Sequence, residues 1–178
     1  MKRDLALWQF AGFVFTALGG TLLHFLYDLT DQNILIAPFS AVNESTWEHL
    51  KLLYYPLFVF ALLQSRCFRD VEGFWCVKLT GTVTGLVLIP LLYYTYNGIF
   101  GKSSHWINIA IFLIAAAIGL IREAQQFKKD PLQCKWSKLA FVLLCLIGVL
   151  FVLFTFAAPK IPMFRDPLTG SYGIDVSQ

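Results

Sequence analysis

The sequence predicts an all-α membrane protein with five transmembrane helices, and three observations support this fold class. Apolar residues make up 57% of the 178 residues and charged residues only 14%, whereas soluble domains carry roughly 25% charged residues. The apolar residues form runs of about 20, which is the length that crosses a bilayer. The charged residues gather in the short stretches between these runs. The composition therefore argues against a soluble domain. Because no basic stretch is interleaved with aromatic residues, it also argues against nucleic-acid binding.

The first predicted helix covers residues 5–27. Lys2 and Arg3 precede this apolar run, as basic residues precede the apolar region of a signal peptide. The run is far longer than that region, however, and no small-residue cleavage site closes it. We therefore expect a retained membrane span.

One face of this first helix combines small and polar residues. Gly12, Thr16, Gly20, His24 and Asp28 recur at intervals of four, so they share one side of a helix. The small residues allow a second helix to approach closely. The ionisable residues near the end of the run are costly in a membrane, and we expect them to face a partner or a cavity.

The other four predicted helices cover residues 46–64, 74–96, 106–121 and 139–158. Residues 29–42, between the first two helices, contain an apolar stretch that is too short to cross a membrane. We expect an interfacial or re-entrant segment there. Its backbone must be covered by protein, because lipid offers no hydrogen-bond partners.

The distribution of Lys and Arg predicts the orientation of the chain, because cytoplasmic loops of membrane proteins carry an excess of these residues. With the N-terminus in the cytoplasm, ten of them lie inside: Lys2, Arg3, Arg66, Arg69, Lys78, Arg122, Lys128, Lys129, Lys135 and Lys138. Four lie outside: Lys51, Lys102, Lys160 and Arg165. Five spans then place the C-terminus outside.

The cysteines and the tail complete the predicted topology. In this orientation Cys67, Cys76, Cys134 and Cys145 lie in inner loops or at inner helix ends. Thiols in that compartment stay reduced, so we expect no disulfide. Residues 159–178 form an extracytoplasmic tail in which three prolines exclude regular helix. The apolar side chains of the tail favour a segment that folds back as a cap.

Ionisable residues converge at the predicted outer ends of the helices. They comprise three histidines and three carboxylates: His24, His49, His105, Asp28, Glu44 and Glu48. Histidine nitrogen and carboxylate oxygen suit zinc and also other divalent metals. The predicted metal ligands are His24, Asp28, His49 and His105. The predicted general base on metal-bound water is Glu44 or Glu48. Asn43, Ser45 and Asn108 are predicted to line the same pocket.

The leading functional hypothesis is a divalent-metal-dependent hydrolase, with zinc as the first choice, acting on a membrane lipid or another amphiphile. Two alternatives stay open. The same groups could carry protons or ions in a small transporter or proton-coupled carrier. They could instead be structural, in an interaction protein without a catalytic role. In that reading Ser45 and Glu48 form a capping box at the helix start, and Glu48 pairs with Lys51.

Two groups of motifs resemble those of an uncharacterised family of small bacterial integral membrane proteins. The motifs are Asn43-Glu44-Ser45, Trp47-Glu48-His49 and Lys51, followed in the tail by Asp166-Pro167, Thr169-Gly170 and Tyr172-Gly173. The likeness extends over nearly the whole chain, with the motifs in the same order. It implies a bacterial, multi-pass protein of the plasma membrane. It brings no established activity, so no catalytic residue follows from it.

Overall fold

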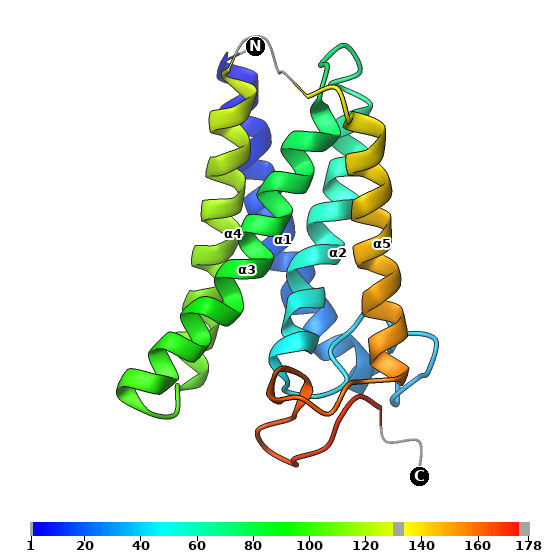
Figure 1. Ribbon diagram of the computed structural model, residues 1–178, viewed down its shortest axis with the longest axis vertical. Coiled ribbons are helices and arrows are strands. Elements are labelled where there is room, and N and C mark those ends of the chain that lie inside the picture. Colours follow the sequence, from blue (N-terminus) through cyan, green and yellow to red (C-terminus); the bar gives the residue numbers. More distant parts are fainter. Residues whose placement is uncertain (1, 130–133, 175–178) are drawn as a thin grey trace.

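A computed structural model describes residues 2–129 and 134–174, and this part of the chain is helical without strands. Five helices run side by side (Figure 1), and a short 3-10 turn, η1 (Pro162–Phe164), follows them. The helices are α1 (Lys2–Leu29), α2 (Thr46–Ser65), α3 (Phe74–Phe100), α4 (His105–Phe127) and α5 (Ser137–Phe156). Four of them, α1, α3, α4 and α5, are long and apolar enough to cross a membrane. Each corresponds to one of the helices predicted from the sequence.

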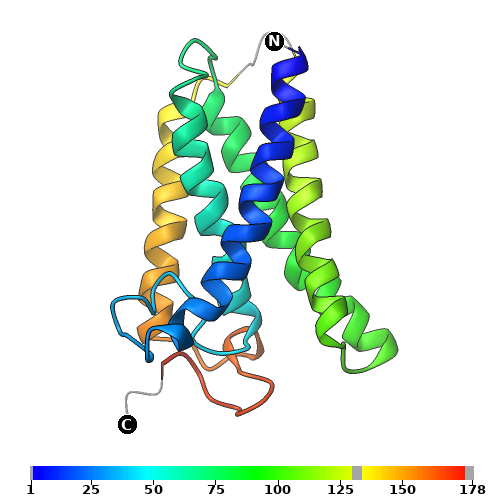
Figure 2. The ribbon, with the colours of Figure 1, turned by 180° about the vertical axis from the view of Figure 1, so that it is seen from behind.

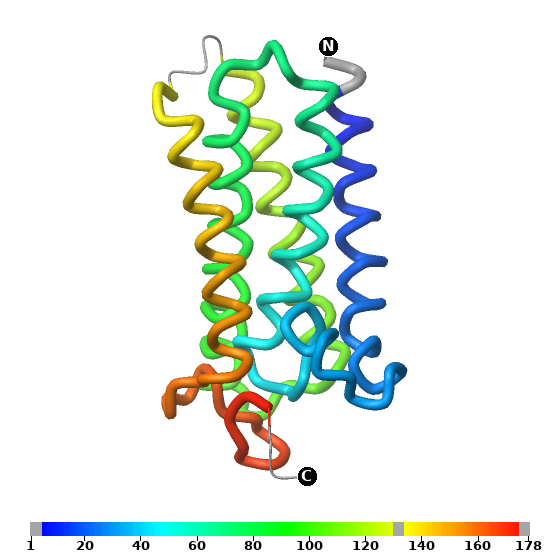
Figure 3. The backbone as a smooth tube through the Cα atoms, turned by 90° about the vertical axis from the view of Figure 1, so that its right-hand side faces the viewer, coloured from blue at the N-terminus to red at the C-terminus, as the bar shows by residue number. Residues whose placement is uncertain are grey.

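The connecting segments lie at the two ends of the bundle (Figure 3). Residues 30–45, 101–104 and 157–174 gather at one end, which we call the loop-rich end. Residues 66–73 lie at the opposite end, near the start of α1. The chain therefore passes along the bundle five times.

Helix α2 occupies the centre of the bundle, where it packs against α1, α3 and α5. Leu53, Tyr54 and Phe60 are among its buried side chains, and the Tyr54 hydroxyl donates to the carbonyl of Leu144 on α5 at 2.6 Å. A helix that is surrounded by other helices does not contact lipid, so its surface need not be apolar on all sides. This position allows α2 to carry buried polar residues that pair with each other, such as Glu48 and Lys51. Helix α2 is the helix that falls outside the four.

Helices α3 and α4 approach each other closely because small residues face each other. A β-carbon built on Gly119 of α4 would lie 2.8 Å from the carbonyl oxygen of Gly81 on α3. Close approach through small residues is the usual packing of membrane helices. Beyond this contact the two helices diverge from the rest of the bundle toward the loop-rich end (Figure 2). The divergence leaves room there for a cavity.

The fourth helix extends further than predicted. Helix α4 ends at Phe127 rather than residue 121, and Glu123 is buried inside the bundle rather than lying in a loop. Its carboxylate pairs with Lys78 of α3 at 2.5 Å and accepts a hydrogen bond from Gln9 of α1 at 3.4 Å. The opposite charge and the hydrogen bond offset the cost of burying the carboxylate.

The expectation of no disulfide is wrong. Cys76 and Cys134 are bonded to each other, with their α-carbons 6.4 Å apart, a separation that a disulfide spans. Cys67 is an exposed free thiol, and Cys145 is a half-buried one. The prediction rested on the reducing conditions expected on the cytoplasmic side of the membrane. It took no account of two residues 58 positions apart meeting at the start of α3.

The segment between α1 and α2 is a series of turns that packs back onto both helices. Ser40 is fully buried, and its hydroxyl donates to the carbonyl of Leu23 and accepts from the amide of Tyr27. Ala37 is also fully buried, and its carbonyl accepts from Lys51 at 3.0 Å. The irregular backbone therefore finds its partners within the protein, as a segment at membrane depth requires.

Candidate metal centre

The start of α2 is fixed by a network of short-range hydrogen bonds. The Ser45 hydroxyl caps the helix by accepting from the amide of Glu48 at 3.3 Å. The reciprocal half of the predicted capping box is absent, because the amide of Ser45 donates to the side-chain oxygen of Asn43 at 2.9 Å. The Glu48 carboxylate instead accepts from the amide of Val42 at 3.0 Å. These bonds hold residues 42–45 in one conformation and thereby orient Glu44.

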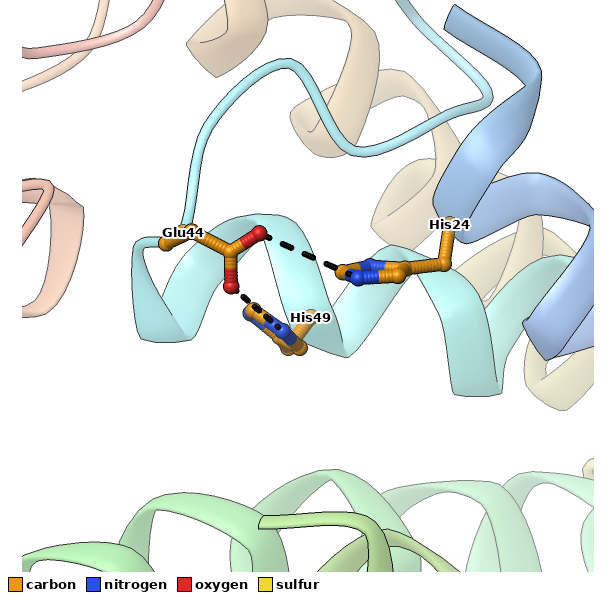
Figure 4. Close-up of side chains that lie close together, drawn as sticks. All are labelled: His24, Glu44 and His49. Atoms are coloured by element: carbon orange, nitrogen blue, oxygen red, sulfur yellow. Dashed lines mark ion pairs between the residues drawn. The ribbon is translucent and has the colours of Figure 1, made fainter. Parts of the chain in front are cut away.

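Three side chains converge beside this helix start (Figure 4). His24 comes from α1, Glu44 from the segment before α2, and His49 from the first turns of α2. The two oxygens of Glu44 face different imidazoles, at 3.8 Å from His24 Nε2 and 3.5 Å from His49 Nε2. One donor atom from each residue lies within 4.8 Å of the other two. All three side chains are half-buried, so the group is shielded but still reachable.

The orientation of the His49 ring suits metal binding. Its Nδ1 lies 2.9 Å from the carbonyl oxygen of Ser45, so Nδ1 carries the proton and donates it. The other ring nitrogen, Nε2, faces Glu44. Metal-binding histidines commonly hold their second nitrogen in this way, through a backbone carbonyl. His24 Nδ1 is buried without a hydrogen-bond partner among the described residues, so no such bond fixes its ring.

Glu48 points away from this group. It forms an ion pair with Lys51 at 2.5 Å, and the Lys51 ammonium also donates to Thr155 of α5 at 2.9 Å. Glu48 is 1% exposed and Lys51 0%. The ion pair foreseen in the structural alternative is therefore present. It joins α2, α5 and the segment before α2, and it leaves Glu48 without access to a water molecule near His49.

The remaining predicted residues lie around the group without joining it. Asp28 is exposed, one helical turn beyond His24, and has no ion-pair partner within the described ranges. His105 is exposed at the first position of α4. Asn108 accepts a hydrogen bond from the hydroxyl of Ser103 at 2.7 Å. Asp28 and His105 are thus not within ligand distance of the other donors.

A cavity of about 640 Å³ adjoins two of the three side chains, Glu44 and His49. Glu44 and His49 form part of one wall, and His105 and Asn108 belong to the wall contributed by α4. Four of the nine residues predicted for one pocket therefore border a common space. The other five do not line it: His24, Asp28, Asn43, Ser45 and Glu48. The volume falls in the range of small-molecule sites, roughly 300–1,000 Å³.

The tail packs against the start of α2. Phe164 of η1 is buried, and its ring stacks on Trp47 with 4.5 Å between centroids. The side-chain amide of Asn43 donates to the carbonyl of Gly173 at 3.1 Å. Gly173 has φ 63°, and a β-carbon there would lie 2.7 Å from the carbonyl oxygen of Thr155. Only glycine combines that backbone conformation with such a close approach.

The family assignment follows from a match along almost the whole chain. The model of a family of unknown function, DUF6512, matches residues 1–174. The chain belongs to this family. No curated protein and no solved structure matches it. The matched range includes all five helices, residues 43–49 and the tail up to Gly173. The function of the family is unknown, so the match assigns no activity.

Sequence reasoning missed the buried polar contacts at the other end of the bundle. Lys78, Glu123 and Gln9 were not candidate residues, because the charges of Lys78 and Glu123 were attributed to loops and helix ends. The spacing of residues along α3 and α4 could have identified Lys78 and Glu123. Lys78 lies three residues before Gly81, and Glu123 lies four residues after Gly119, so each charge extends a close-packed face.

Proposed function

We propose that His24, Glu44 and His49 bind one divalent metal ion, with zinc as the best match, and that the protein is a metal-dependent membrane hydrolase. Two histidines and one glutamate are a ligand set of catalytic zinc, with the fourth position left to water or substrate. The observation that carries the proposal is the position of the Glu44 carboxylate between two imidazoles.

The distances support a site that an ion could complete with small movements. Around tetrahedral zinc with bonds of about 2.0–2.1 Å, donor atoms lie about 3.4 Å apart. The two contacts of Glu44 measure 3.5 and 3.8 Å. A bound metal would lower the pKa of a coordinated water and supply the nucleophile. The chain's own part is to hold the ligands and to admit substrate from the adjoining cavity.

The proposed setting is a bacterial plasma membrane, crossed five times with the N-terminus in the cytoplasm. The four long apolar helices support a multi-pass protein, and the excess of Lys and Arg at the end opposite the centre supports this orientation. The Cys76–Cys134 bond lies at the same end as that excess and argues against it, because disulfides are rare in the cytoplasm. The centre then lies near the outer leaflet, from which a lipid or another amphiphile enters. In this setting the tail acts as a cap over the start of α2.

The transporter alternative has less support. A carrier would need a passage between α1 and the face of α3 that carries Gly81 and Gly85. Those positions are filled: a β-carbon on Gly81 would meet Glu123 at 2.3 Å, and one on Gly85 would meet Leu53 at 2.8 Å. The structural alternative has specific support in the buried Glu48–Lys51 pair, which joins three segments without any ligand.

The decisive experiment measures metal in the purified protein. We expect about one zinc per chain by mass spectrometry of the elements, and a tetrahedral cobalt(II) spectrum after exchange. His24→Gln and His49→Gln should each lower zinc affinity at least tenfold, whereas His105→Gln, the matched control, should retain it. Absence of a stoichiometric ion in the wild type, or equal retention in all three variants, rules out the metal centre.

The hydrolase part has a separate test. Amphiphilic esters and phosphoesters presented in micelles should be cleaved by the zinc-loaded protein and not after chelation. Glu44→Gln should abolish the cleavage together with tight metal binding. Full metal occupancy without cleavage of any such substrate would contradict the hydrolase and leave a metal-binding membrane protein.

A further inference from the structure

We propose that the cavity beside the metal centre takes an amphiphile with an anionic head group, selected by Lys102, His105 and Arg165. This inference rests on the proposed function for the role of its ligand, because the metal centre would act on the bound molecule. The binding itself depends on a different set of residues and can be tested without the metal.

The space available is larger than the single cavity. A second cavity of about 550 Å³ shares Thr46, Tyr93, Tyr94, Pro167 and Leu168 with the first. The two are therefore neighbours, and together they form a groove bordered by the diverging ends of α3 and α4, the start of α2 and the tail. A groove of this size accommodates a head group and part of a hydrocarbon chain.

Basic side chains border both parts of the groove. Lys102 and His105 border the first cavity, and Arg165 borders the second. Lys102 and Arg165 are exposed, and neither forms an ion pair in residues 2–129 and 134–174. These cationic groups are free to bind an anion, and the guanidinium of Arg165 can bind phosphate or carboxylate through two parallel hydrogen bonds.

The acidic residues beside the groove are already engaged. Glu44 lies between His24 and His49. Asp166 is buried, and its two oxygens accept from the amide of Leu168 at 2.8 Å and from the hydroxyl of Thr169 at 2.7 Å. Within the described residues neither acid pairs with Lys102 or Arg165, so these two cations remain available to an anionic head group.

The rest of the lining explains why the ligand is an amphiphile rather than a free anion. Ile89, Ile111 and Phe112 form an apolar wall of the first cavity. Trp106 also borders it and is 81% exposed, as is common for aromatic residues at a membrane interface. A small soluble anion would leave this wall in contact with water. A hydrocarbon chain would cover it at a gain of about 25 cal/mol for each Å² buried.

The test measures lipid selectivity on the full chain in detergent micelles, by native mass spectrometry with titrated lipid. The probes are phosphatidic acid, phosphatidylcholine of the same acyl chains, and soluble glycerol phosphate. We expect phosphatidic acid to bind at least tenfold more tightly than the other two. Lys102→Gln and Arg165→Gln should each reduce this preference about fivefold, which is the effect of one basic residue near an anionic lipid.

Lys160→Gln is the matched control, because Lys160 is exposed in the same tail but borders neither cavity. It should leave the preference unchanged. Equal binding of the two lipids, or equal losses in all three variants, would overturn the proposal. Tight binding of glycerol phosphate would show an anion site without an amphiphile and would overturn it as well.

A parallel titration tests whether lipid binding depends on the metal. The titration is repeated on His49→Gln, whose metal content is measured on the same sample. If the lipid preference persists there, the groove acts independently of the metal centre. If the wild type binds zinc but shows no preference for phosphatidic acid, only the present inference fails.

Discussion

Replacing Lys51 by Met tests how the ion pair with Glu48 supports the candidate centre. The substitution keeps a long apolar side chain and removes the ammonium. Glu48 would then be a buried carboxylate without a countercharge, which costs about 3–5 kcal/mol. The carbonyl of Ala37 and the hydroxyl of Thr155 would also lose the donor that lies 3.0 and 2.9 Å away. We therefore expect the free energy of unfolding to fall by at least about 3 kcal/mol.

The double variant Lys51→Met with Glu48→Gln separates charge from packing. It leaves a neutral amide in place of the unpaired carboxylate, so it should be more stable than Lys51→Met alone by about 1–3 kcal/mol. The measurement is reversible unfolding in mixed micelles with increasing denaturing detergent. Lys160→Met serves as the control, since an exposed lysine should change stability by less than about 0.5 kcal/mol.

The same variants should affect metal binding through the backbone. Glu48 accepts from the amide of Val42, two residues before Glu44, so losing the pair should release that segment and weaken zinc binding. A Lys51→Met protein as stable as the wild type, or a double variant less stable than the single one, would refute the reasoning.

Three further outcomes are expected. Asn43→Ala removes the bond to Gly173, so limited proteolysis should cleave the tail faster than in the wild type. Gly119→Ala places a β-carbon 2.8 Å from the Gly81 carbonyl and should destabilise the protein by about 1–3 kcal/mol, measured in the same detergent titration. In the denatured but unreduced protein, maleimide should not label Cys134, and labelling should appear after reduction. Unchanged cleavage, unchanged stability or immediate labelling would contradict the respective contact.

The helices could be predicted because their information is local. Four of the five apolar runs have the length and composition of a membrane helix, whatever their neighbours are. The end of α4 could not be found in this way. Glu123 looks like a solvated residue in the sequence, and only its pairing with Lys78 on another helix allows it to be buried. The disulfide has the same non-local character.

The candidate centre was partly predictable for a related reason. The spacing on the first helix pointed His24 toward a partner, and the motif at the start of α2 supplied Glu44 and His49. The sequence alone did not show which of Glu48 and His49 faces the cavity and which faces the protein interior. Neighbouring residues on a helix point about 100° apart, so only one of them can face the cavity while the other faces the protein interior. The cavity side belongs to His49, and the interior position is stabilised by Lys51.

The contact between Asn43 and Gly173 has a consequence for biosynthesis. These two residues are 130 positions apart, and the second one follows all five helices in the chain. The tail can therefore pack against the start of α2 only after α5 has been synthesised, and in the proposed orientation only after the tail has been translocated. A nascent protein would lack this contact until that late step, so the segment before α2, which carries Glu44, would be held by fewer bonds during synthesis.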